Sequence, residues 1–93
     1  MPTLNSSLLI PAYVSFTFVD GEAVLLNTRS NQYFALEEVG ARLWTLLKDS
    51  QGLNDAYQVL LTEYEVEPEE LERDILELVT HLLENGLVEL VQE

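Results

Sequence analysis

Cysteine is absent from this chain of 93 residues. The absence excludes disulfide bonds, thiolate metal sites and thiol nucleophiles, so packing alone must stabilise the fold. Long apolar runs are absent as well, since none approaches the roughly 18 to 20 residues that span a bilayer. The four glycines are scattered, which excludes a glycine-rich phosphate loop.

Basic residues are few. Four Lys and Arg against 17 Asp and Glu give a formal net charge of -13. A field of that sign repels phosphate backbones and anionic lipid headgroups, so we expect no nucleic acid and no membrane as partners. Solubility explains most of this charge, and attraction to a basic partner is the alternative.

Residues that could carry chemistry are scarce. His81 is the only histidine, which excludes a multi-histidine metal cluster or relay. No serine stands in a strand-turn-helix nucleophile setting, and residues 49–55 lack the alternating oxygen ligands of a calcium loop. The acidic residues near the C-terminal third have the spacing of a solvated helix face: Glu67, Glu69, Glu70, Glu72, Asp74 and Glu77. We therefore expect no enzyme, no metal and no cofactor.

The length predicts one domain with a core of modest size. Residues 1–12 lack periodicity and contain Pro2 and Pro11, so we expect a flexible or loosely docked lead-in to a domain at residues 13–93. The lead-in has neither the positive region nor the long apolar stretch of a signal peptide, which favours a cytoplasmic location.

The first half of the domain has the pattern of β-strands. Apolar and polar residues alternate before Asp20-Gly21, a dipeptide typical of two-residue hairpins. A hairpin with this turn pairs Phe18 with Ala23 and places the aromatic face over the core. Turn residues then precede an aromatic third segment. The pattern predicts a three-stranded antiparallel meander at residues 13–19, 23–27 and 32–36.

The second half has helical periodicity from Glu37 onward. We expect Asn54 to cap the second helix, Pro68 to begin the third, and Asn85-Gly86 to end it. Residues 87–91 form a short strand or an extension. The predicted fold class is α+β, a three-stranded antiparallel sheet followed by a three-helix bundle, which is winged helix-turn-helix-like. A DNA-binding role would require a basic recognition helix, and the third helix has only Arg73.

One surface of this fold is a candidate for binding. The third strand of a meander has a free edge, which can accept a peptide strand. The apolar arc of the third helix spans roughly 160°, wider than one packing seam needs. Part of it can therefore line a groove beside the free edge, with Asp74 and His81 next to Leu78 on one border. The alternative is that the whole arc belongs to the core.

Several segments together resemble the PqqD family. They are Asp20 to Thr28, Tyr33 to Leu36 and Glu38 to Trp44, followed by Tyr64 to Pro68, Leu71, Asp74, Leu82 and Gly86-Leu87-Val88. The resemblance covers about residues 13–90. Proteins of this kind are precursor-peptide recognition elements, which bind the leader peptides of ribosomally made, modified peptides and are not catalysts.

The resemblance also implies a binding mode. The leader would add as an extra strand to the third strand and lie in a groove against the third helix. The implied contacts are Gln32, Tyr33, Phe34, Ala35, Leu36, Asp74, Leu78 and His81. The implied partners are a precursor leader peptide and a leader-removing cysteine protease or another modifying enzyme.

Two departures bear on the pathway. Members that act in pyrroloquinoline quinone synthesis usually carry an early strand with arginine and tryptophan and a cysteine near the first helix. Residues 16–19 and the absence of cysteine depart from that pattern. The sequence is therefore most similar to a stand-alone leader-binding protein of lasso peptide biosynthesis. The alternatives are a PqqD-type chaperone partner of a radical SAM enzyme and a general protein–protein adaptor.

Overall fold

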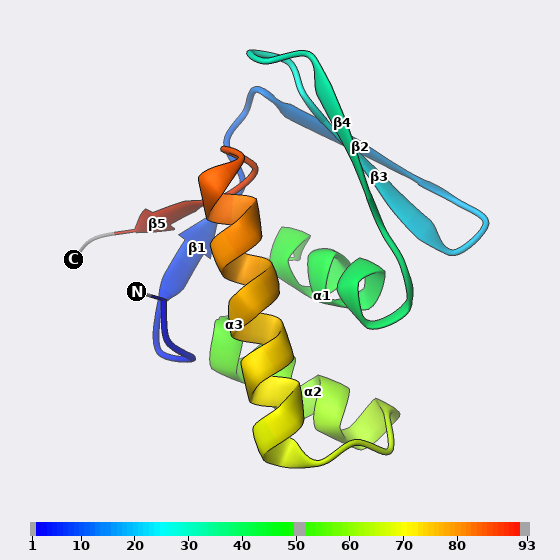
Figure 1. The fold of residues 1–93 in the computed structure, drawn as a ribbon, viewed down its shortest axis with the longest axis vertical. Helices are drawn as coiled ribbons and strands as arrows, with labels where there is room; N and C mark the ends of the chain where they lie inside the picture. Colours follow the sequence, from blue (N-terminus) through cyan, green and yellow to red (C-terminus); the bar gives the residue numbers. More distant parts are fainter. Residues whose placement is uncertain (1, 50–51, 92–93) are drawn as a thin grey trace.

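The computed structural model describes residues 2–49 and 52–91 and has the predicted α+β class (Figure 1). A three-stranded antiparallel sheet is followed by three helices, which lie together on one side of it. The elements are β1 Ser7–Leu9, β2 Val14–Val19, β3 Glu22–Asn27, β4 Gln32–Leu36, α1 Glu38–Lys48, α2 Leu53–Glu63, α3 Pro68–Glu84 and β5 Glu89–Val91.

The β2–β3 hairpin forms as predicted. Asp20 and Gly21 have φ of 51° and 84°, the two positive values that a type I′ turn requires. The register pairs Phe18 with Ala23 as predicted, and Ala23 is fully buried. Phe18 itself is 44% exposed, so the predicted aromatic face covers the core at Phe16 but not at Phe18. The strand order is β2-β3-β4, so β4 pairs with β3 alone and its other edge is open. The predicted free edge of the third strand is confirmed.

Trp44 of α1 occupies the interface between the sheet and the helices. Its side chain is 0% exposed, and its ring meets the Phe16 ring edge-on at a centroid distance of 5.5 Å. The buried residues Leu25, Leu82 and Leu87 belong to the same cluster. A second cluster fills the space between the three helices. The sheet is thus held on α1 and the end of α3.

The start of α2 differs from the prediction. The N-cap is Gly52 and the helix begins at Leu53, whereas Asn54 is an exposed residue inside the first turn. Ala56 donates its backbone N–H to the Gly52 carbonyl at 2.9 Å. Leu53 is 1% exposed within the helix cluster, so its burial draws the helix past the better capping residue.

Both ends of α3 follow local chemistry. Pro68 lies in the first turn, where its missing N–H costs no helical hydrogen bond. Gly86 has φ of 70°, and the N–H groups of Gly86 and Leu87 donate to the carbonyls of Leu83 and Leu82 at 3.2 and 2.9 Å. These bonds form a Schellman cap, which confirms the predicted end of the helix.

The lead-in contains a strand that the sequence pattern did not predict. β1 pairs with β5 in an antiparallel two-stranded sheet, with Leu8 opposite Leu90. Leu4 and Leu8 pack against the core, and Pro11 is buried. A strand of three residues is too short to show periodicity, and its partner lies at the other end of the chain. A domain boundary at residue 13 stays a prediction, whereas β5 confirms a short final strand.

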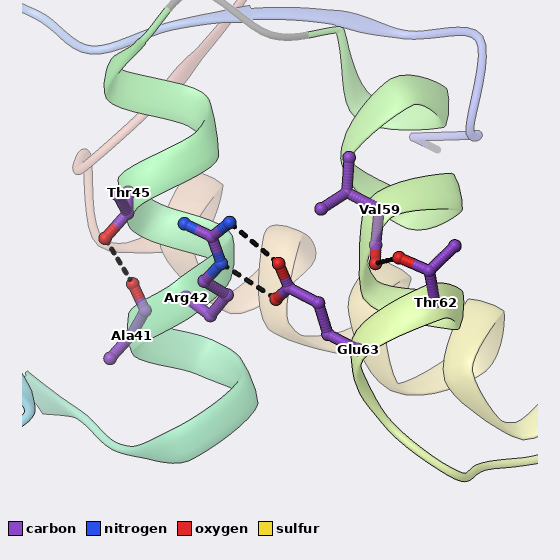
Figure 2. Close-up of polar contacts among 6 residues, drawn as sticks. All are labelled: Ala41, Arg42, Thr45, Val59, Thr62 and Glu63. Atoms are coloured by element: carbon purple, nitrogen blue, oxygen red, sulfur yellow. Dashed lines mark hydrogen bonds and ion pairs between the residues drawn. The ribbon is translucent and has the colours of Figure 1, made fainter.

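Arg42 joins α1 to α2 (Figure 2). Its Nε and Nη2 donate to the two carboxylate oxygens of Glu63, both at 2.8 Å. These hydrogen bonds hold the pKa of Glu63 below its ordinary value, so the stabilisation is present at neutral pH and is lost as pH falls through that lowered pKa. Both side chains are exposed, so solvent screens the pair.

No helix within residues 2–49 and 52–91 is long and apolar enough to cross a bilayer.

Candidate functional site

The open edge of β4 presents specific backbone groups, which the register identifies. The closing pair of a two-residue hairpin is hydrogen-bonded, and bonded pairs then alternate along antiparallel strands. With Val19 and Glu22 as the closing pair, the even-numbered residues of β3 bond to β2. The Thr28 N–H donates to the Tyr13 carbonyl at 3.1 Å, so this even-numbered residue just after β3 also bonds toward the β2 side.

The odd-numbered residues of β3 consequently bond to β4. The bonded pairs are Ala23–Leu36, Leu25–Phe34 and Asn27–Gln32. Tyr33 and Ala35 therefore direct their N–H and C=O groups to the open edge. An added strand would find its first hydrogen-bonding partners at these two residues.

The two faces of β4 differ. Phe34 and Leu36 are half-buried, whereas Tyr33 and Ala35 are exposed, as expected from a strand with one face on the core. Tyr33 is 71% exposed, the largest value among the exposed large hydrophobic residues. Gln32 is exposed at the start of the strand, where it pairs with Asn27.

The predicted helix residues lie along one face of α3, because positions 74, 78 and 81 follow i, i+4, i+7 spacing. The His81 ring meets the Phe34 ring edge-on at a centroid distance of 6.4 Å. A Cβ added at Gly40 of α1 would lie 3.5 Å from Leu78 Cδ2 and 3.6 Å from Leu36 Cβ. The structure thus brings the core-facing side of β4 next to Leu78 and His81.

A pocket of about 150 Å³ continues this surface beyond the end of β4. Of the predicted helix residues, Asp74 and Leu78 line it and His81 does not, and Asp74 is its one charged lining residue. The other lining residues are Val39, Gly40, Leu43, Val66, Leu71 and Ile75. Sequence reasoning did not assign these six to a binding surface. The sequence contained two weak signals: Gly40 stands inside a helix at a cost of about 1 kcal/mol, and Val66 is an apolar residue between Glu65 and Glu67. In the structure Val66 is 40% exposed.

The position of β4 relative to α3 depends on Asn27, a buried polar residue 6% exposed. Its Nδ2 donates to the Asn85 carbonyl at 2.9 Å, so the end of β3 is tied to the end of α3. Its Oδ1 accepts the N–H groups of Arg29 and Ser30 at 2.9 and 3.2 Å and so holds the β3–β4 turn. One side chain therefore orients both parts of the candidate site.

Replacing Asn27 with alanine is expected to lower the free energy of unfolding by about 1–3 kcal/mol, because three partly buried hydrogen bonds are lost. Urea denaturation followed by circular dichroism measures the loss. Ser30→Ala, in the same turn but exposed, is the control, because the backbone of Ser30 is not left-handed, unlike that of Asn31, where φ is 60°. A loss no larger for Asn27 than for Ser30 would contradict this role.

The chain is similar to known proteins over most of its length. The family model described as "Coenzyme PQQ synthesis protein D (PqqD)" matches residues 22–88. The solved structure "TbiB1 in Complex with the TbiA(beta) Leader Peptide" is 30% identical and aligns over 90% of this chain and 98% of its own, with a TM-score of 0.84. "Lasso peptide synthetase B1 complexed with the leader peptide" is 37% identical over 89% and 98%, with a TM-score of 0.81. Among curated proteins no match is found.

Proposed function

Because the chain belongs to the PqqD family, we propose that it captures the leader segment of a ribosomally made precursor peptide and presents it to processing enzymes. The observation that carries the proposal is the open edge of β4, which lies beside α3 and continues into an apolar pocket. Both similar structures are described as complexes with leader peptides, which supports the same role here.

The proposed mechanism is strand addition. The leader extends the antiparallel sheet at β4, and the outward N–H and C=O groups of Tyr33 and Ala35 set its register. Apolar leader side chains enter the surface formed by Leu36, Leu78 and the pocket beside Asp74, which supplies selectivity. Of the predicted contacts, Tyr33 and Ala35 lie on the solvent face of β4, and Gln32 lies at the start of the strand on the same face as Phe34 and Leu36. Phe34 and His81 form an aromatic wall near the end of α3.

The pathway that we propose is lasso peptide biosynthesis. The similarity to lasso peptide synthetase B1 supports it, and so does the absence of cysteine. In this pathway the domain is a non-catalytic cytoplasmic protein that hands the leader to a cysteine protease. The PqqD family match favours a second candidate, a chaperone partner of a radical SAM enzyme. Co-purification of the tagged chain with the enzymes encoded beside it distinguishes the two.

A titration tests leader capture directly. The ¹⁵N-labelled chain is titrated with the TbiA(beta) leader peptide and with the leader of the precursor encoded beside this chain. Saturable amide shifts centred on Gln32 to Leu36 and on Asp74 to His81 are expected with the native leader. Absence of binding by both peptides would overturn the proposal, and binding that shifts other residues would relocate the site.

Leu78→Asp is expected to weaken leader binding by about tenfold or more, because a carboxylate would replace the apolar contact between α3 and the bound strand. Leu76→Asp is the matched control, since Leu76 is also half-buried but lies on the opposite border of α3. Fluorescence anisotropy with a labelled leader measures both affinities. Equal losses in the two variants would mean that the effect is a general loss of stability.

A further inference from the structure

The apolar arc of α3 has a second border that leader capture does not use. The middle of the arc is buried, at Leu71, Ile75, Val79 and Leu82. Both borders are only half-buried: Leu78 faces β4, and Leu76 lies on the other side. A groove of about 580 Å³ runs along the Leu76 border. Its lining residues are Pro2, Glu69, Glu72, Arg73, Leu76, Glu77 and Thr80.

The groove combines an apolar floor with an acidic rim. Leu76 and Pro2 supply apolar surface, and the Thr80 hydroxyl is already occupied as a donor to the Leu76 carbonyl at 2.8 Å. The rim has the carboxylates of Glu69, Glu72 and Glu77 against the single cation of Arg73. Its net charge is therefore negative by two, from three carboxylates and one guanidinium.

The Lys and Arg side chains of the other described elements do not neutralise this rim. Arg42 pairs with Glu63, and Lys48 pairs with Asp49. Arg29 stacks over the Tyr13 ring at 4.0 Å. Among the residues that the structure describes, no ion pair joins a rim carboxylate to a cation within 4.0 Å. A basic segment of another molecule would supply charge complementary to the rim.

We propose that this groove docks a basic segment of a partner protein, with an apolar side chain on Leu76 and Lys or Arg side chains at Glu72 and Glu77. Charge complementarity selects this occupant. A second copy of the chain would bring another net charge of -13, and nucleic acid would be repelled in the same way. Because Leu76 and Leu78 lie on opposite borders of α3, the groove and the β4 edge can be occupied together.

Peptide display provides the first test, with short random peptides as the probe. The full chain is used for selection, and the enriched peptides are mapped by amide shifts. Enriched peptides are expected to combine two or more Lys or Arg with a large apolar residue and to shift Glu72, Leu76 and Thr80. Failure to enrich any peptide, peptides without basic residues, or shifts confined to Gln32 to Leu36 would each overturn the proposal.

Matched charge variants separate recognition by the rim carboxylates from attraction by the net negative charge of the whole chain. Glu72→Gln combined with Glu77→Gln is expected to weaken binding of an enriched peptide by about tenfold. Glu22→Gln combined with Glu89→Gln removes the same charge from β3 and β5 and should weaken it less than about twofold. Equal losses would show non-specific attraction and overturn the proposal. Leader binding by the same variants is titrated separately. A failure of peptide docking in the groove can therefore be told apart from a failure of leader capture at β4.

Discussion

Ala35→Pro is expected to weaken leader binding by about tenfold or more while the helices stay folded. The N–H of Ala35 faces the open edge of β4, so proline removes a donor that the added strand would use without breaking a bond to β3. The proline ring also occupies space where the incoming backbone must approach. Isothermal titration with the native leader measures the loss, and circular dichroism reports the helices.

Two other proline variants are the controls for this prediction. Phe34→Pro removes an N–H that bonds to Leu25 of β3, so it is expected to destabilise the sheet itself. Phe18→Pro removes an N–H that faces the open edge of β2, on the opposite side of the sheet from β4, and should leave leader binding nearly unchanged. Full affinity in Ala35→Pro would rule out strand addition at β4, and an equal loss in Phe18→Pro would point to general distortion.

Trp44→Ala is expected to lower the free energy of unfolding by about 3–5 kcal/mol, the usual cost of deleting a large buried aromatic side chain. Trp44 is fully buried against Phe16, in the cluster that joins the sheet to α1 and α3. Because small domains have only about 5–15 kcal/mol of stability, such a loss could unfold the chain. Urea denaturation at several temperatures measures it.

Trp44→Phe separates packing from hydrogen bonding. The Trp44 Nε1 is buried and has no hydrogen-bond partner among the described residues, so its removal relieves an unsatisfied donor. Phenylalanine should therefore cost clearly less than alanine, although the smaller ring leaves some space unfilled. If Trp44→Phe proved as damaging as Trp44→Ala, the Nε1 group would have a role that this packing does not explain.

Local chemistry alone specified much of the fold. Asp20-Gly21 predicted a turn because both positions need positive φ, and Gly86 predicted the end of α3 for the same reason. The alternating pattern placed Phe16 and Phe18 on one face, and the bounds of β4 agree with the predicted residues 32–36. Each of these features depends on neighbours within a few positions, so the sequence contains the information directly.

Other features were decided by contacts between distant segments. The start of α2 moved to Leu53 because burial outweighed the capping preference of Asn54. β1 forms only because β5 lies beside it. Neither effect has a local signal, since each depends on side chains or backbone groups many residues away.

The candidate site shows the same division. The sequence predicted that the third strand has an open edge and that α3 has an apolar side that includes Leu78. Which amides face the open edge required the register, because a shift of one residue would exchange Phe34 for Ala35. The pocket beside Asp74 required the packing of α1 on α3 at Gly40, and the placement of β4 required the Asn27 hydrogen bond to Asn85. Periodicity thus determined which residues share a face, and only the tertiary structure decided which faces meet.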